Sequence, residues 1–463
     1  MANSKRAARV QDRKRYLRLI KHRNFTNSVF GVADYLVLPA LMIVAAPILV
    51  HRLGLEQFGL WMLITSIISS GGLIGSGFGD AAVHYISTYR GRGDSAGVER
   101  TLHSMLWINA VLGATLAIFL WIVTPIAVGS LFKISGNLHV PAETALHFGA
   151  IALSLKCIEN VFSGCLRALE KYRPTANINI VTRTVTVVSA LALSLSGFGV
   201  VAIVAAATFA NALGLTLHAL WVRRTLALRT ICPRLHRDSL AEVARFGSFS
   251  WLQALAGVAF NHADRLLIGA YLGAGAVGIY SICAQAAQVI HGVVASGSHF
   301  MFPHLAAHNG SGDVIGAERR FRIGLVFNLL AAVGLASMFV IFSHRLLSLW
   351  MGPEFALQGT VVLRALAVAY GMLAMNVVSH YALLAVGEVR FVSLLNVTSG
   401  IAGLATSVFL IPSLGMIGAA TGRMVQGLIT WVNFWRVHSY FVDRKGPMPQ
   451  EEIRQLETRI GMS

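Results

Sequence analysis

The sequence predicts an all-α integral membrane protein with about twelve transmembrane helices, arranged as two pseudosymmetric six-helix bundles around a central cavity. Three observations carry this prediction: an apolar composition, regularly spaced apolar segments and an internal repeat. Hydrophobic residues make up 55% of the 463 residues and charged residues only 13%, with a mean hydropathy of +0.65. Since soluble domains average about 25% charged residues, this composition excludes an ordinary soluble globule.

The number of helices follows from the apolar segments, because a helix needs about 20 apolar residues to cross a bilayer. Twelve segments of suitable length recur along the chain. They lie near residues 28–50, 58–80, 102–124, 145–167, 174–195, 199–221, 247–271, 276–303, 323–343, 358–386, 390–411 and 416–441.

An internal repeat is visible in two short turns. Leu53-Gly54 followed by Gly59-Leu60-Trp61 has the same spacing as Leu272-Gly273 followed by Gly278-Ile279-Tyr280. Equivalent residues of the two turns are separated by the same number of positions along the chain. The same separation, called the offset below, relates Gly93-Asp94 to Gly312-Asp313 and Glu99-Arg100 to Glu318-Arg319. Further along, a slightly smaller offset relates Asn160 and Gly199 to Asn376 and Gly415. Such repeats are typical of transporters built from two bundles around a midplane site.

The basic residues predict the orientation. The net charge is +18, which in a soluble protein would suggest a nucleic-acid partner; here none is expected. With both ends inside, 30 Lys and Arg fall in cytoplasmic segments, and only Arg52, Lys133 and Arg345 fall in outer loops. This asymmetry is the positive-inside rule, and it predicts cytoplasmic termini.

Five regions follow from the spans and the charges. They are a basic cytoplasmic N-terminal tail (1–24), an N-terminal six-helix bundle (25–221), a cytoplasmic connector (222–246), a C-terminal six-helix bundle (247–441) and a cytoplasmic C-terminal tail (442–463). No signal peptide is visible, so the first span is expected to act as an uncleaved insertion signal. No cofactor or metal is expected: His304 and His308 are four residues apart, but they lack a third ligand.

The turn motifs also carry a family resemblance. Leu53-Gly54-x4-Gly59-Leu60-Trp61, Gly77-Phe78-Gly79-Asp80-Ala81-Ala82 and Asp264-x7-Leu272-Gly273-x4-Gly278-Ile279-Tyr280 resemble the polysaccharide-biosynthesis (Wzx-type) flippases. These belong to the multidrug/oligosaccharidyl-lipid/polysaccharide exporter superfamily. The resemblance covers about residues 25–440. It implies two six-helix bundles and movement of an undecaprenyl-pyrophosphate-linked glycan across the bacterial inner membrane, for O-antigen, capsule or exopolysaccharide synthesis. Membrane lipids, and a polysaccharide polymerase, are the further partners it suggests.

Candidate site residues are the ionisable side chains inside the spans. A charge at a helix centre costs at least about 2.5–3.5 kcal/mol if it faces lipid, so these side chains should face a cavity or a partner. The expected substrate-binding cations are Lys156, Arg183, Arg265, Arg364 and Arg423, and the acids expected to pair or couple are Asp34, Glu159 and Asp264. Guanidinium and ammonium groups suit a pyrophosphate.

Several alternatives stay open. Lys156 and Glu159, three apart on one helix face, can form a self-neutralising structural pair. Arg364 and Arg423 can instead extend to the outer surface. A cation-coupled multidrug exporter of the same superfamily, with Asp34 as its acid, is the closest rival function. A membrane enzyme is disfavoured because the outer loops are short and show no catalytic constellation, and a non-transporting scaffold would not need five buried cations.

Overall fold

The computed structural model of the chain describes residues 2–132, 134, 136–228, 230–231, 233–234, 257, 262–298 and 314–443. Side chains are described from Val37 onward, apart from residues 77–81, 297, 314–315, 317 and 442–443. Every regular element in these ranges is a helix, which confirms the all-α prediction. Nine stretches of the described residues are long and apolar enough to cross a membrane. The first, Val37–Ser76, holds parts of two predicted spans, whereas most of segment 247–271 lies outside the described residues.

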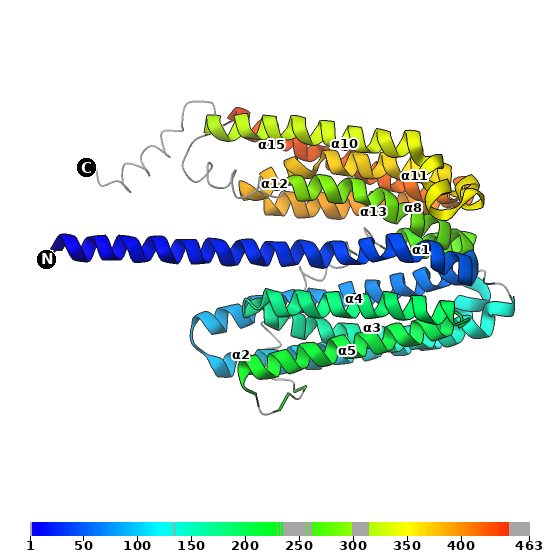
Figure 1. The fold of residues 1–463 in the computed structure, drawn as a ribbon, viewed down its shortest axis with the longest axis horizontal. Helices are drawn as coiled ribbons and strands as arrows, with labels where there is room; N and C mark the ends of the chain where they lie inside the picture. Colours follow the sequence, from blue (N-terminus) through cyan, green and yellow to red (C-terminus); the bar gives the residue numbers. More distant parts are fainter. Residues whose placement is uncertain are drawn as a thin grey trace. The chain divides into compact units, whose positions relative to one another are not determined.

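The chain divides into two compact units, Met1–Gly278 and Ile279–Ser463. Unit 1 contains α1 (Ala2–Gly91), α2 (Ser95–Ile126), the short helices η1 (Ala127–Leu131) and η2 (Gly136–Leu138), α3 (His139–Ala168), α4 (Tyr172–Leu195), α5 (Val200–Leu226) and α7 (Ala263–Leu272). Within it, α3 packs against α1, α2 and α5, and α4 packs against α1 and α5 (Figure 1). The apolar core includes Leu102, Met105, Phe162 and Leu166.

Unit 2 begins within α8 (Ala274–Ser298) and continues through α10 (Val314–Met351), α11 (Pro353–Met375), α12 (Val377–Ala385), α13 (Val389–Leu414), α14 (Met416–Thr430) and α15 (Val432–Asp443). Here α11 packs against α10 (Figure 1). Helix α11 also packs against α14, which packs against α13. Phe321, Leu383, Val437 and Phe441 lie in an apolar cluster that joins α10, α12 and α15.

The backbone repeats landmarks at the offset that the sequence predicts. Gly54 divides α1 into two arms with φ 80° and ψ 162°, and its repeat equivalent Gly273 separates α7 from α8 with φ 85° and ψ 176°. Both values lie in a region that glycine adopts without steric cost.

The end of α3 and the end of α12 share one hydrogen-bonding pattern. The Lys171 amide donates to the Leu166 carbonyl at 2.8 Å, and in the second half of the chain the Glu388 amide donates to the Leu383 carbonyl at 3.0 Å. The residue before each donor has a positive φ, 58° at Glu170 and 90° at Gly387. Two helix ends that close in the same way support the duplication that the sequence indicates.

The glycines next to the two turns pack against each other inside unit 1. A Cβ added to Gly278 would lie 2.8 Å from the Leu55 carbonyl oxygen, and a Cβ added to Gly59 would clash with the Ala274 carbonyl oxygen. Gly59 and Gly278 are equivalent in the repeat, and so are Leu55 and Ala274. The contact is therefore self-complementary, the same patch meeting itself.

Two predicted spans are interrupted. Segment 358–386 is divided into α11 and α12 at Asn376, and segment 416–441 into α14 and α15 at Trp431. At the first break the Asn328 amide of α10 donates to the Ala374 and Met375 carbonyls at 3.1 and 2.8 Å. A side chain from another helix thus satisfies carbonyls that leave the helical ladder, which is what permits a break inside a span.

Candidate functional site

A buried cluster of charged and polar side chains lies between α3 and α5 in unit 1. Lys156 Nζ is 2.7 Å from Glu159 Oε2, and His218 Nδ1 is 3.3 Å from Glu159 Oε1. The Glu159 side chain is 2% exposed and the His218 side chain 0%, while the Lys156 side chain is 33% exposed. The carboxylate is therefore held from both sides, and the ammonium is the one group of the three that is partly open.

Helix geometry and glycines make room for this cluster. Residues three apart share a helix face, which brings Lys156 and Glu159 together. On α5, a Cβ at Gly214 would lie 3.2 Å from Glu159 Oε1 and 2.8 Å from the Thr182 hydroxyl of α4. On α1, a Cβ at Gly72 would lie 3.0 Å from Lys156 Cγ. The two glycines thus let α5 and α1 approach the charged face of α3 closely.

Asn160 extends the cluster toward α1. Its side-chain amide donates to the Gly72 carbonyl at 2.6 Å, which ties α3 to the second arm of α1 next to Lys156. Because Asn160 follows Glu159 directly, this bond fixes the rotation of α3 that points the Lys156 and Glu159 side chains into the unit.

His218 is a member of the cluster that the sequence prediction missed. It lies inside the predicted span 199–221, where any ionisable side chain is expensive and marks a functional site. Only Lys, Arg, Asp and Glu entered the prediction, so this histidine was overlooked. Counting histidines inside spans would have found it, although not its partner.

Arg183 lies on α4 directly after Thr182 and is half-buried. Adjacent residues on a helix point about 100° apart. Since Thr182 borders Gly214 and Glu159, Arg183 occupies a neighbouring face of α4 in the same unit.

Asp264 and Arg265 begin α7, also in unit 1. The Asp264 carboxylate accepts the Arg265 backbone amide at 2.9 Å, and the residue is 7% exposed. A carboxylate in the first turn of a helix complements the helix dipole. Asp264 therefore lies at the helix start, and Arg265 is half-buried beside it.

The two cations of unit 2 differ in environment. The Arg423 guanidinium of α14 stacks over the Tyr370 ring of α11 at 5.3 Å, and the residue is 8% exposed. Arg364 of α11 is exposed, and its Nε donates to the Ser343 hydroxyl of α10 at 2.9 Å. Arg364 is therefore exposed, whereas Arg423 is buried within unit 2. The remaining predicted residue, Asp34, lies outside the described side chains.

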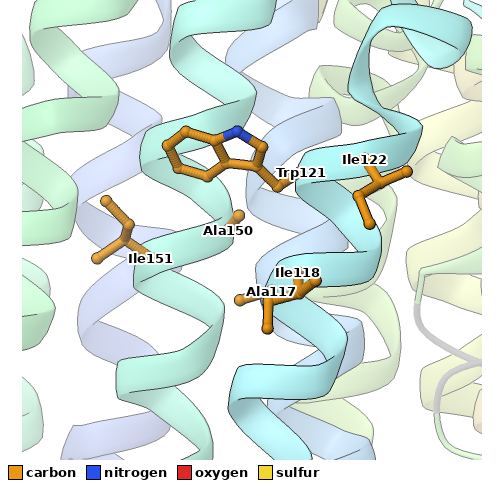
Figure 2. Close-up of a pocket in the computed structure, with 6 residues that line it drawn as sticks. All are labelled: Ala117, Ile118, Trp121, Ile122, Ala150 and Ile151. Atoms are coloured by element: carbon orange, nitrogen blue, oxygen red, sulfur yellow. The ribbon is translucent and has the colours of Figure 1, made fainter.

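An apolar pocket lies between α2 and α3 and has a volume of about 220 Å³. Figure 2 shows its lining, which consists of Ala117, Ile118, Trp121, Ile122, Ala150 and Ile151. No predicted site residue is among them, and an apolar lining cannot hold a pyrophosphate. Among the described residues, no group of three or more His, Cys, Asp or Glu side chains is placed to bind a metal ion.

Comparisons with known proteins give a consistent family. The family described as "Polysaccharide biosynthesis protein" matches residues 31–307. A "Putative O-antigen transporter" of Shigella flexneri is 21% identical over 408 residues, covering 87% of this chain and 94% of the relative. A "Probable multidrug resistance protein NorM" of Rhizobium meliloti is 25% identical over 317 residues, covering 66% and 67%.

Solved structures show the same fold. An inward-facing multidrug resistance MATE family transporter of the MOP superfamily matches with a TM-score of 0.72 at 16% identity, over 90% of this chain and 100% of its own. A MOP superfamily transporter from Pyrococcus furiosus matches with a TM-score of 0.58 at 15% identity, over 91% and 97%.

Proposed function

The chain belongs to the polysaccharide biosynthesis protein family, and from this premise we propose that it is a flippase for an undecaprenyl-pyrophosphate-linked oligosaccharide. Without regard to its cargo, the chain is a multi-pass membrane transporter of the superfamily that includes the MATE proteins. The proposed cargo serves O-antigen, capsule or exopolysaccharide synthesis at the bacterial inner membrane. Both termini are proposed to be cytoplasmic, because the basic residues divide 30 to 3 between the two sides.

The observation that carries the proposal is Lys156. Its ammonium is held inside a membrane-spanning unit by a carboxylate that is 2% exposed, yet a third of its own side-chain surface stays open. A charge kept in this position is costly, which favours a functional role. An ammonium with donors to spare suits the pyrophosphate of a lipid-linked sugar. Arg183 on α4 and Arg265 on α7 are the further cations of the same unit that we assign to the anion site.

A second candidate function is export of cationic or amphipathic drugs. The likeness to a multidrug resistance protein and to MATE structures favours it. The two functions require opposite charge preferences, so the buried cations separate them. A drug exporter should gain from losing Lys156 or Arg183, whereas a pyrophosphate carrier should lose its activity.

The test is complementation of a flippase-deleted strain, with surface glycan normalised to the membrane abundance of each variant. Arg183→Ala should abolish glycan export without lowering the protein level, and Arg183→Lys should retain part of it because a cation remains. The matched control is Arg320→Gln, since Arg320 is an exposed residue of α10. Normal export by Arg183→Ala, or loss explained by missing protein, would make Arg183 structural. Drug tolerance without glycan export would establish the second function instead.

A further inference from the structure

The apolar pocket between α2 and α3 exists because small residues face each other where the two helices diverge. At one end of the pocket the helices touch, since a Cβ added to Gly113 of α2 would lie 3.1 Å from the Ser154 carbonyl oxygen of α3. One turn away on each helix, Ala117 and Ala150 face the gap with side chains that are too short to fill it (Figure 2). The space that remains, about 220 Å³, has room for several methylene groups.

The lining of the pocket faces the surroundings of unit 1 and not its interior. Ile118, Ile122 and Ile151 are 59%, 68% and 44% exposed. The helices that carry them, α2 and α3, are long and apolar enough to cross a membrane, so the hydrocarbon chains of lipids are the medium that surrounds this lining. All six lining residues are uncharged, and burying a charged group against them would be costly. The pocket therefore suits a hydrocarbon chain.

Polar groups lie at the other end of the pocket, at the depth of the lipid headgroups. Trp121 stacks on His147 of α3 with ring centroids 4.0 Å apart, and both lie within one helical turn of the ends of the predicted spans 102–124 and 145–167. Tryptophan is enriched at this depth of a membrane. Glu143 is one turn beyond His147, on the same face of α3 and just outside the predicted span. It is half-buried and forms no ion pair with another described residue.

We propose that unit 1 binds one phospholipid with an amine headgroup, a phosphatidylethanolamine, at this pocket. One acyl chain lies in the pocket, which extends about 12 Å along α2 from Trp121 to Gly113. The ammonium of the headgroup pairs with the Glu143 carboxylate, and the Trp121 indole N–H donates to an ester or phosphate oxygen between them. Apolar lining, interfacial ring and carboxylate thus follow one another in the order in which the lipid carries its chain, its esters and its amine.

The carboxylate distinguishes this lipid from the proposed cargo. Glu143 attracts an ammonium and repels a pyrophosphate, so the headgroup end of the pocket favours the amine lipid. The chain gains van der Waals contacts from two helices and from the indole, whereas a flat helix surface offers contacts from one side only. The site is thus separate from the Lys156 cluster, and it does not depend on which cargo the protein carries.

The experiment locates the lipid by photo-crosslinking. Full-length protein in detergent is incubated with phosphatidylethanolamine that carries a diazirine in one acyl chain, irradiated, and digested for peptide mass spectrometry. Crosslinks should concentrate on residues 117–122 of α2 and 150–151 of α3. Unlabelled phosphatidylethanolamine should compete about two- to fivefold more strongly than phosphatidylglycerol, which is the range expected for one partly exposed ion pair.

Three variants test the assignment. Ala117→Phe places a ring in the pocket and should lower crosslinking at residues 150–151 by about tenfold or more, because the chain is excluded. Ala114→Phe is the matched control: Ala114 is an exposed residue of the same helix that does not line the pocket, so crosslinking should stay within about twofold of wild type. Glu143→Gln keeps the size of the side chain without its charge, so crosslinking should persist while the preference for phosphatidylethanolamine disappears.

Each contrary outcome overturns a stated part of the inference. Equal crosslinking by Ala117→Phe and wild type, or labels spread evenly over the exposed helix faces, would show that the pocket is not a lipid site. Stronger competition by undecaprenyl phosphate than by phosphatidylethanolamine would assign the pocket to a polyprenyl chain instead. An unchanged headgroup preference in Glu143→Gln, or a preference of the wild type for phosphatidylglycerol, would refute the pairing of the amine with Glu143.

Discussion

The charged cluster of unit 1 has an apolar counterpart in unit 2. At the offset in the numbering that relates Asn160 to Asn376, Lys156 corresponds to Met372 and Glu159 to Met375. The same offset places Phe434 where unit 1 has His218. The helix geometry was therefore duplicated, but the three titratable side chains occur in one copy only.

At the corresponding positions of unit 2, backbone carbonyls accept hydrogen bonds where unit 1 has charged side chains. The Met375 carbonyl accepts the Asn328 amide at 2.8 Å, and the Met372 carbonyl accepts the Trp431 indole N–H at 3.2 Å. The corresponding helix of unit 1, α3, is unbroken from His139 to Ala168. One copy thus keeps a straight helix with an ion pair, and the other keeps a broken helix with hydrogen-bonded carbonyls. The comparison teaches that the two halves satisfy buried polarity in different ways, unit 1 with paired side chains and unit 2 with hydrogen-bonded backbone carbonyls.

Breaking the ion pair should have the largest effect. Glu159→Leu leaves the Lys156 ammonium in the unit without its carboxylate, and loss of one partner of a buried pair costs about 3–5 kcal/mol. Because Lys156 is partly open, we expect the lower end of that range. The thermal unfolding midpoint in detergent, with membrane abundance, measures the loss. An unchanged midpoint would contradict the buried-pair description.

The triple exchange Lys156→Met, Glu159→Met, His218→Phe sharpens the same comparison, because it gives unit 1 the residues of unit 2. Replacing a buried ion pair by apolar side chains is often neutral or stabilising. The triple variant should therefore unfold at or above the midpoint of Glu159→Leu while exporting no glycan. Export by a stable triple variant would show that the charges of unit 1 do not serve transport.

The glycine contact should give the next largest effect. Gly59→Ala places a Cβ against the Ala274 carbonyl oxygen, and overpacking costs about 1–3 kcal/mol. Gly275→Ala is the control, because nothing lies within 4 Å of a Cβ there. Comparing the two unfolding midpoints in detergent tests the contact, which predicts a loss for Gly59→Ala alone.

A smaller difference should separate the equivalent asparagines Asn109 and Asn328. Asn328→Leu removes the amide that donates to the carbonyls at the break between α11 and α12. The carbonyls left unpaired should lower the free energy of unfolding by about 1–3 kcal/mol. Among the described residues, the Asn109 amide donates to the Met105 carbonyl of its own helix, at 3.1 Å. Asn109→Leu should therefore lower the thermal unfolding midpoint less than Asn328→Leu does. Equal decreases in the midpoint would argue against the role of Asn328 at the break.

The smallest effect is expected at Arg364. Arg364→Gln removes an exposed guanidinium that has water and lipid headgroups as alternatives, and export should stay within twofold of wild type. Arg423→Gln removes a buried guanidinium and its contact with Tyr370, worth up to about 2 kcal/mol when desolvated, and should reduce export more. The measurement is surface glycan per unit of membrane protein for each of the two variants. A larger loss for Arg364→Gln than for Arg423→Gln would refute the distinction between the exposed and the buried arginine.

The sequence predicted what depends on local patterns. Runs of apolar residues locate the helices, and a glycine at a tight turn marks Gly54 and Gly273 because few other residues adopt that backbone. The Lys156–Glu159 pair was also predicted, since helical spacing alone brings the two side chains together.

Features that depend on contacts between distant helices were not predicted. At the break near Asn376 the carbonyl of Ala374 is bonded by Asn328 of another helix, and His218 is in contact with Glu159 of another helix. The different exposures of Arg364 and Arg423 follow from which helix faces are covered, and spacing along one helix does not reveal that. Where Asp34 points, and whether the predicted cations of the two units act together, stay predictions.

The self-complementary contact between Gly59 and Gly278 also has an evolutionary consequence. After a gene duplication the two copies of a position normally drift apart independently, as Lys156 and Met372 have done. These two glycines cannot, because each is the other's neighbour and a side chain on either occupies space that the other copy needs. A substitution that one copy could accommodate alone is therefore excluded by the presence of the other, so this contact ties the two positions together.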